Sequence, residues 1–221
     1  MTSCEAAFFD LDGTILALSS EKLFCYELCK ERQVSLGGFA RVLGIFLRYE
    51  LGLVEDYEDL KRSVLGTILP NLSCQTIQAR ASLFFQERQE PKIRRNALGE
   101  IVRHRTAGRR LYLVSSTLDC LADPVGHYLG IESRFMTRLE VDDGKYTGGI
   151  AGDIYYGPSK ATLLHQLARD DDLDLSRSFA YGDSIQDAPM LAAVGRPYAV
   201  NPDRRLRRLA RERKWQVVDW T

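Results

Sequence analysis

The 221-residue sequence has no excess of charge of either sign and no long apolar segment. Its 30 basic and 30 acidic side chains cancel, so no overall field favours nucleic acid or an anionic membrane surface. No apolar run reaches the roughly 18 residues of a membrane-spanning helix, and no basic segment followed by an apolar stretch marks a secretory signal. We therefore expect a cytoplasmic protein without a nucleic-acid partner and without stable membrane insertion.

Cysteine and histidine are too few and too scattered to form a site of their own. The five cysteines lack the Cys-x-x-Cys spacing of zinc sites, and an odd number argues against a disulfide framework. The three histidines lie far apart in the sequence. With 45% hydrophobic and 27% charged residues, the composition is that of an ordinary globular protein. The chemistry must therefore come from other side chains.

The apolar pattern divides the chain into an α/β part and an inserted helical part. A short buried strand is predicted at residues 5–9, just before acidic and glycine residues. Residues 17–90 have apolar side chains at helical spacing, which predicts roughly four helices. Strands and helices alternate after residue 90, which predicts a Rossmann-like, doubly wound parallel sheet covered on both faces. We expect a core of residues 1–16 and 91–221 and an all-helical cap domain of residues 17–90.

Turn residues and apolar runs place the individual elements of the second part. Gly108 and Gly130 end helices, and Asp142-Asp143-Gly144 is a strong hairpin signal. Helices are predicted at residues 93–106, 118–129, 158–168 and 204–213, and strands at 111–114, 139–141, 145–147, 178–181, 198–200 and 216–218.

Polar residues follow three of the predicted strands at the point where each strand ends. They lie at residues 10–14, 115–117 and 182–187. In parallel sheets of this kind, ligands bind outside the carboxyl ends of the strands. We therefore expect the three segments to form one site, with the helical insertion above it.

The acidic residues of these segments suit a divalent cation and phosphoryl transfer. Like charges as close as those of Asp10 and Asp12 require a cation or hydrogen-bond donors, and Mg²⁺ prefers carboxylate, carbonyl, water and phosphate oxygens. Asp10, Asp183 and the main-chain carbonyl of Asp12 are the expected Mg²⁺ ligands. Asp187 is an additional or outer ligand. We predict that Asp10 attacks phosphorus and forms an acyl phosphate, and that Asp12 carries the proton.

The phosphoryl oxygens need further donors. Ser115 and Lys160 are the expected ones, with Ser116 as an alternative to Ser115 because the two neighbours can exchange roles. Thr14, at the end of the first acidic segment, is a further candidate for phosphate binding.

These residues resemble the four motifs of the haloacid dehalogenase-like (HAD) superfamily. Residues 8–14 resemble its first motif, DxDGT, and residues 182–187 its fourth, GDxxxD. Ser115 resembles the second motif and Lys160 the third. The helical insertion is similar to the cap of the phosphoserine-phosphatase-like branch, subfamily IB. The resemblance implies an aspartyl-phosphate mechanism, dependence on Mg²⁺ and a small phosphorylated metabolite of the phosphoserine or histidinol phosphate class as substrate.

The residues expected to read the substrate depart from that branch. Phosphoserine phosphatases usually carry a glutamate nine residues after the nucleophile, where this chain has Ser19, with Glu21 two residues further on. The arginine of the cap lacks a clean counterpart, because Arg62 is out of step by about one residue. Ser19, Glu21 and Arg62 are therefore the candidate substrate-reading residues, and a lipid or sugar phosphate stays open as substrate.

Two other functions are compatible with the same residues. A phosphotransferase or mutase would pass the phosphoryl group from the same phosphoenzyme to a sugar. A receiver-type signalling domain also accepts phosphate with acidic residues and Mg²⁺, but receivers are much shorter and lack the helical insertion. For the hydrolase we expect a small-molecule phosphate ester as partner and a monomer or homodimer.

Overall fold

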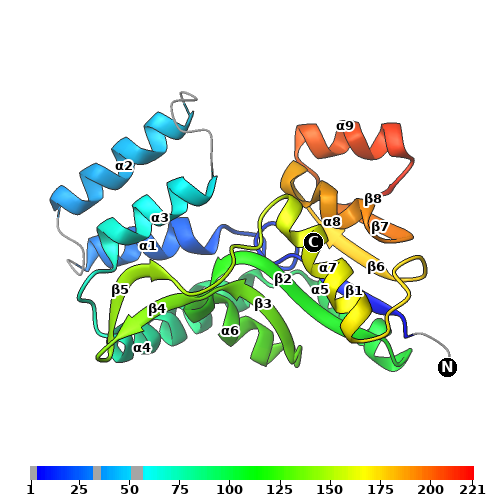
Figure 1. The fold of residues 1–221 in the computed structure, drawn as a ribbon, viewed down its shortest axis with the longest axis horizontal. Helices are drawn as coiled ribbons and strands as arrows, with labels where there is room; N and C mark the ends of the chain where they lie inside the picture. Colours follow the sequence, from blue (N-terminus) through cyan, green and yellow to red (C-terminus); the bar gives the residue numbers. More distant parts are fainter. Residues whose placement is uncertain (1–3, 32–35, 51–56) are drawn as a thin grey trace.

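A six-stranded parallel sheet forms the centre of the structure, a computed structural model that describes residues 4–31, 36–50 and 57–221. The middle strand β1 pairs with β2 on one side and β6 on the other, so the carboxyl ends of these three strands meet at one edge (Figure 1). Across the sheet the order is β3 (Ser133–Thr137), β2 (Arg110–Leu118), β1 (Ala6–Phe9), β6 (Phe179–Gly182), β7 (Arg196–Val200) and β8 (Gln216–Val218).

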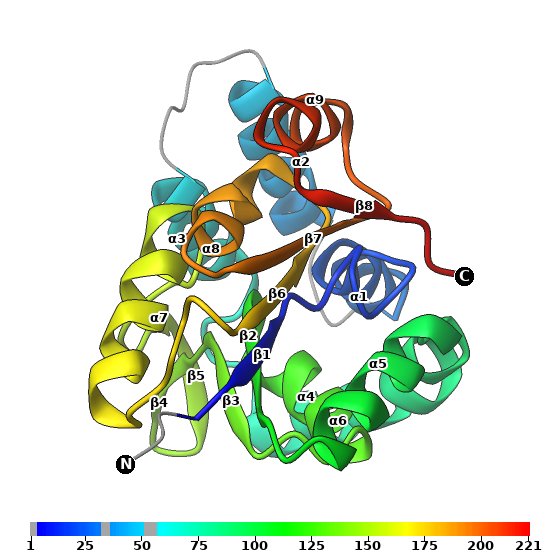
Figure 2. The same cartoon turned by 90° about the vertical axis from the view of Figure 1, so that its right-hand side faces the viewer.

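Helices cover both faces of the sheet, because successive side chains of a strand point to opposite faces (Figure 2). Ala7 and Phe9 pack toward α5 (Arg95–Thr106) and α6 (Asp119–Tyr128). Ala6 and Phe8 pack toward the other side, where three helices contribute to one apolar cluster. The doubly wound α/β class predicted from the sequence is thus confirmed. These three helices are α7 (Pro158–Asp170), α8 (Ala188–Ala192), which follows the short turn η3 (Ile185–Asp187), and α9 (Arg204–Arg213).

Among the described residues, the α-helices α1 to α4 between β1 and α5 form a second, smaller body beside the sheet (Figure 1). A two-stranded antiparallel hairpin joins them, and an apolar cluster that includes Phe24, Leu65 and Phe84 lies at their centre. The hairpin therefore belongs with the helices in space, although it lies far from them in sequence. The elements are α1 (Ser20–Lys30), α2 (Leu36–Glu50), α3 (Tyr57–Ile68), α4 (Cys74–Phe84), the turns η1 (Phe85–Gln89) and η2 (Glu90–Lys92), and the hairpin strands β4 (Leu139–Asp142) and β5 (Lys145–Ile150).

Two strands depart furthest from the sequence-based expectation. The strand β3 was not predicted, because its side chains run from exposed to buried along the strand and do not alternate. The prediction also ended β2 at residue 114, whereas β2 continues to Leu118 through a shift of register against β3. Ser115 and Ser116 therefore lie within the strand. Within the described ranges, no helix is both long and apolar enough to cross a membrane.

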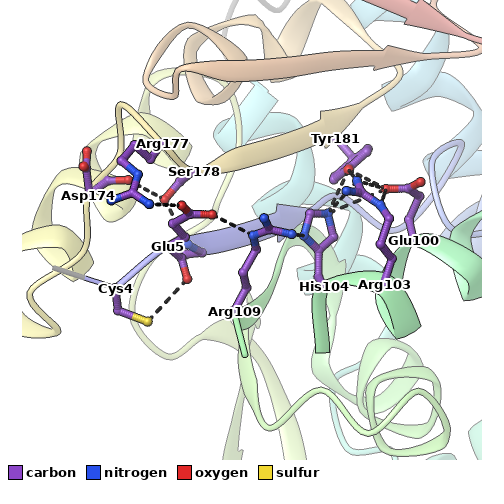
Figure 3. Close-up of polar contacts among 11 residues, drawn as sticks. Cys4, Glu5, Glu100, Arg103, His104, Arg109, Asp174, Arg177, Ser178 and Tyr181 are labelled. Carbon is purple, nitrogen blue, oxygen red and sulfur yellow. Dashed lines mark hydrogen bonds and ion pairs between the residues drawn. The ribbon is translucent and has the colours of Figure 1, made fainter. Parts of the chain in front are cut away.

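A hydrogen-bonded chain of polar side chains connects α5 with the sheet on the α5 face (Figure 3). The Tyr181 hydroxyl donates to Glu100 at 2.8 Å and lies 2.8 Å from His104 Nε2, and Arg109 lies 3.4 Å from His104 Nδ1. Since Arg109 can only donate, His104 Nδ1 accepts and His104 Nε2 carries the proton, so the ring is neutral. Burial, reinforced by the neighbouring Arg103 and Arg109, lowers the pKa of His104 to about 4.

The low pKa of His104 predicts that stability depends on pH. The unfolded chain binds a proton at an ordinary histidine pKa of about 6.5, while the folded chain resists it until about pH 4. The free energy of unfolding should therefore fall by about 2 kcal/mol through this group as the pH drops from 6.5 to 4. Urea denaturation over this range should show a shallower fall in His104→Gln. His165→Gln, which changes an exposed histidine of α7, is the control, and equal slopes in all three proteins would contradict the assignment.

Candidate active site

The three polar segments predicted from the sequence meet at the carboxyl edge of the sheet. Asp10 follows β1 directly, and its backbone N–H donates to Tyr181 O of β6 at 3.0 Å. Asp183 follows β6, and Ser115 lies in β2 beside β1. Because these parallel strands are neighbours, their ends bring together side chains that are up to 173 residues apart in the sequence.

Three carboxylates and one ammonium form the centre of the site. One carboxylate oxygen each from Asp10, Asp183 and Asp187 lies within 4.8 Å of the others. Lys160 Nζ, from the first turn of α7, lies 2.6 Å from Asp10 Oδ1 and 2.6 Å from Asp187 Oδ1. Of the four side chains, those of Asp10, Asp187 and Lys160 are buried.

The centre carries more negative than positive charge when its carboxyl groups are ionised. Burial, together with repulsion between the neighbouring carboxylates, raises the pKa of Asp10 and of Asp183. Burial disfavours the ammonium of Lys160, but the carboxylates of Asp10 and Asp187 raise its pKa, so the lysine is charged. The three carboxylate oxygens form a donor set that fits a hard divalent cation such as Mg²⁺, because the single ammonium does not balance their charge.

Asp187 connects this centre to the loop after β6. While Oδ1 accepts from Lys160, Oδ2 accepts from the backbone N–H groups of Asp183 and Ser184 at 3.1 and 3.0 Å and from the Ser184 hydroxyl at 3.2 Å. A Cβ atom on Gly182 would lie 2.4 Å from Asp187 Cβ. A glycine is therefore required for Asp187 to fold back over the loop that carries Asp183.

Gly13 and Thr14 hold the carboxylate of Asp183. Gly13 has a φ of +85°, and a Cβ atom there would lie 2.2 Å from Asp183 Oδ2. The Thr14 hydroxyl donates to Asp183 Oδ1 at 3.2 Å and is fully buried. Thr14, which we predicted to bind phosphate, thus contacts the acidic centre through Asp183.

Asp12 points away from the centre, to the beginning of α1. Its Oδ2 accepts from the backbone N–H of Ser20 at 2.8 Å, and its Oδ1 accepts from the Ser20 hydroxyl at 2.5 Å. Gln89 of η1 donates in turn to the Ser20 hydroxyl at 2.9 Å. Burial raises the pKa of Asp12 to about 7, although the bonds from Ser20 oppose the shift.

The sequence analysis missed Ser20 and Gln89 as site residues. A serine at the start of a helix is a visible capping signal, so Ser20 was within reach of sequence reasoning. Gln89 lies 69 residues from Ser20, and nothing in the local sequence distinguishes it from an exposed helical glutamine. Its burial arises from the packing of η1 against α6, where it also donates to Leu121 O at 3.2 Å.

The two adjacent serines of β2 lie in different surroundings. Ser115 is buried, and its hydroxyl lies 3.0 Å from the Thr117 hydroxyl. The Ser116 hydroxyl lies 3.4 Å from the Tyr57 hydroxyl of α3, and its carbonyl accepts from Thr137 at 2.6 Å. Ser115 thus belongs to the floor of the site, and Ser116 meets the helical body above it.

One of the predicted substrate-reading residues lies outside the site. Arg62 is exposed and does not line the site, whereas its neighbour Lys61 is buried and does. Lys61 Nζ lies 2.6 Å from Glu21 Oε1 and also donates to Ser116 O. A step of one residue turns a side chain by about 100° around a helix, which is enough to exchange the inner for the outer face. Ser19 and Glu21 do line the site.

A cavity of about 630 Å³ lies between the acidic centre and the helical body. Its volume is within the roughly 300–1,000 Å³ of typical ligand sites. Asp10, Asp12, Ser115, Lys160 and Asp183 are among its lining residues on the sheet side. The sequence-predicted residues therefore share one cavity, apart from Thr14 behind Asp183 and the exposed Arg62.

An α/β sheet with a cavity at its carboxyl edge places the chain in the class of α/β proteins that bind their ligands at the strand ends. The sequence model of the haloacid dehalogenase-like hydrolases matches residues 7–192 of the chain. The chain belongs to this family, which confirms the resemblance found from its motifs.

Several known proteins are similar over nearly the whole chain. An inhibition of morphological differentiation protein from Streptomyces azureus is 37% identical, over 97% of this chain and 78% of the relative. A phosphoserine phosphatase from Mycobacterium tuberculosis is 33% identical over 97% and 70%, and a histidinol-phosphatase from Neisseria meningitidis is 30% identical over 97% and 98%. A Bordetella pertussis crystal structure of unknown function, 30% identical, covers 99% of both chains with a TM-score of 0.88.

The contact between Gly13 and Asp183 predicts a loss of cation binding. In Gly13→Ala the new methyl group collides with the Asp183 carboxylate and displaces it from its present position in the acidic centre. The affinity for Mg²⁺, measured by isothermal titration calorimetry, should fall about tenfold or more. Gly99→Ala is the matched control, because a Cβ atom there meets open space. Unchanged affinity in Gly13→Ala, with both variants folded by circular dichroism, would contradict the proposed ligand role of Asp183.

Proposed function

We propose that the chain is a Mg²⁺-dependent phosphomonoester hydrolase that forms an aspartyl-phosphate on Asp10. The observation that carries this proposal is the cluster of Asp10, Asp183 and Asp187 around Lys160 at the floor of a cavity. Family membership and the phosphatase names of two similar proteins support it. Asp10, Asp183 and the main-chain carbonyl of Asp12 would hold the ion, with Asp187 as an outer ligand, and bound Mg²⁺ would offset the charge of the phosphoryl oxygens.

In the first step a carboxylate oxygen of Asp10 attacks phosphorus and the bond from phosphorus to the ester oxygen breaks. Asp12, in its protonated form, gives its proton to that oxygen, and the alcohol leaves. Lys160 keeps Asp10 in place through the 2.6 Å contact and faces the phosphoryl oxygens as a point charge. Ser115 and Ser116 are the further candidate donors to these oxygens.

In the second step water hydrolyses the acyl phosphate. Asp12, now a carboxylate, takes a proton from water, whose oxygen attacks phosphorus and displaces the carboxylate of Asp10. Inorganic phosphate leaves, and both aspartates return to their starting states. Ser20 keeps the Asp12 carboxyl group at the beginning of α1 through both steps, because it donates to each of the two oxygens.

Replacement of the nucleophile tests the covalent step. Asp10→Asn should lower the release of phosphate from p-nitrophenyl phosphate with added Mg²⁺ by a factor on the order of 10³ or more, since an amide cannot form the acyl phosphate. Asp143→Asn, in the exposed turn of the β4–β5 hairpin, is the matched control. Phosphate release by the wild type without any sugar acceptor separates a hydrolase from a phosphotransferase. Substantial activity of Asp10→Asn would refute the phosphoenzyme.

The effect of replacing the proton carrier on the rate should depend on the leaving group. Asp12→Asn cannot protonate the ester oxygen, so kcat for an alkyl phosphate should fall by a factor on the order of 10²–10⁴. The loss should be smaller for p-nitrophenyl phosphate in the formation of the acyl phosphate, because p-nitrophenolate leaves without protonation. Burst and steady-state kinetics of both esters measure the difference. An equal fall in the rate of acyl-phosphate formation from both esters would rule out the acid role of Asp12.

A further inference from the structure

The cavity above the acidic centre continues into the apolar interior of the helical body. Its lining away from the sheet includes buried side chains from α1, α2, α3 and α4. These are among the residues of the apolar cluster that holds the four helices together. Protein interiors are ordinarily packed with few voids larger than a water molecule. A space of this size beside apolar side chains is therefore unusual and indicates a binding site for an apolar group. The lining includes Phe24, Leu28, Val42, Leu65, Ile68 and Ile77.

Helix α1 leads from the proton carrier into this apolar space. Ser20, at its first turn, holds Asp12, while Phe24 and Leu28 lie one and two turns further along the same helix. With a rise of 1.5 Å per residue, they lie about 6 and 12 Å beyond Ser20 along the axis. In the proposed reaction the organic group of the ester is attached to the oxygen that Asp12 protonates. That group therefore starts beside Asp12 and extends along the apolar wall of α1.

The charged side chains that could read an amino-alcohol phosphate are occupied with each other. Glu21 Oε1 lies 2.6 Å from Lys61 Nζ and accepts from the backbone N–H of Leu118 at 3.0 Å. Lys61 also donates to Ser116 O, and its side chain is 3% exposed. Both ends of this ion pair are thus fixed to the main chain of β2. A substrate carboxylate would have to take the buried Lys61 from Glu21, which leaves a charge without its partner and is strongly unfavourable. A substrate amine would meet Glu21, which is 30% exposed but whose charge Lys61 already offsets.

Apolar side chains also reach the surface beside the cavity. Tyr26 of α1 and Leu43 of α2 line it while they are 59% and 61% exposed. Single exposed apolar residues are common, but two that also line one apolar cavity provide an entrance for a hydrocarbon chain. The remaining charged cap residue of the described lining, Lys22, is exposed.

We propose that the substrate is a phosphate monoester of a long-chain hydrocarbon alcohol. The inference rests on the phosphatase activity proposed above. The phosphate group lies on the acidic floor and the chain lies along α1, between Phe24 and Leu28 and the apolar side chains of α2 and α3. Hydrolysis releases the long-chain alcohol, which takes the proton of Asp12, and inorganic phosphate.

A chain-length series tests the inference separately from the phosphatase activity. With Mg²⁺ and esters below their micelle concentrations, kcat/KM should rise about threefold per methylene from ethyl to decyl phosphate until the cavity is filled. Phosphoserine and histidinol phosphate should be poorer substrates than decyl phosphate. If p-nitrophenyl phosphate is hydrolysed but chain length has no effect, or phosphoserine is preferred, the long-chain inference is wrong and the hydrolase proposal stands. Hydrolysis of none of these esters would refute the hydrolase proposal.

A variant that narrows the apolar part of the cavity gives a second test. Val64→Trp, on α3, places a large side chain into the lining and should lower the ratio of kcat/KM for decyl over ethyl phosphate at least tenfold. Val102→Trp, at an exposed position of α5, is the matched control and should keep the ratio of the wild type. Thermal melts show whether both variants fold, and Cys25→Phe, also in the lining, replaces Val64→Trp if that variant does not.

A binding measurement keeps the inference testable without turnover. Decylphosphonate should bind Asp10→Asn at least tenfold more tightly than ethylphosphonate in isothermal titration calorimetry, because only the longer chain fills the apolar part of the cavity. Equal affinities of the two phosphonates would overturn the inference whatever the activity of the wild type.

Discussion

The buried ammonium of Lys160 between Asp10 and Asp187 is the contact on which the rest of the site depends. Two carboxylates this close to each other repel, and the positive charge from α7 offsets that repulsion at 2.6 Å on each side. Without Lys160 the two buried acids would lose the cation between them, although Asp187 would keep its bonds to the β6 loop, and removal of one partner of a buried ion pair typically costs about 3–5 kcal/mol. Because Asp187 also holds the loop of Asp183, one ammonium with two ion pairs positions the end of β1, α7 and the β6 loop together.

In the proposed mechanism two aspartates of one loop have different roles because they have different surroundings. Asp10 faces Lys160 and the acidic centre, while Asp12 faces Ser20 at the beginning of α1. Neighbouring carboxyl groups in unlike environments are a recurrent basis for the division into nucleophile and acid. The helix that holds Asp12 also supplies Phe24 and Leu28 to the cavity, so one element would both fix the proposed proton carrier and shape the space for the proposed leaving group.

Local sequence signals predicted the sheet, its acidic strand ends and the helical insertion, because strands and their polar ends are encoded in short segments. The features that were not predicted depend on packing between segments that are distant in the sequence. The partner of Glu21 is Lys61 and not Arg62, since only the packing of α3 decides which of two adjacent side chains faces inward. The burial of Gln89 and the half-exposed edge strand β3 have the same origin. The core and cap boundaries at residues 16/17 and 90/91 stay a prediction.

The contacts that join the helical body to the sheet also limit what the site can recognise. The Glu21–Lys61 pair is fixed to β2, and the ring of Tyr57 stacks on that of Tyr156 with centroids 3.6 Å apart. These contacts hold α1 and α3 over the acidic floor. A charge that holds the two bodies together is not available to a ligand at the same time. Because the ion pair holds the helical body on the sheet, only apolar surface is left to distinguish between substrates above the phosphate. The shape of the cavity, and not its charge, should therefore select the substrate.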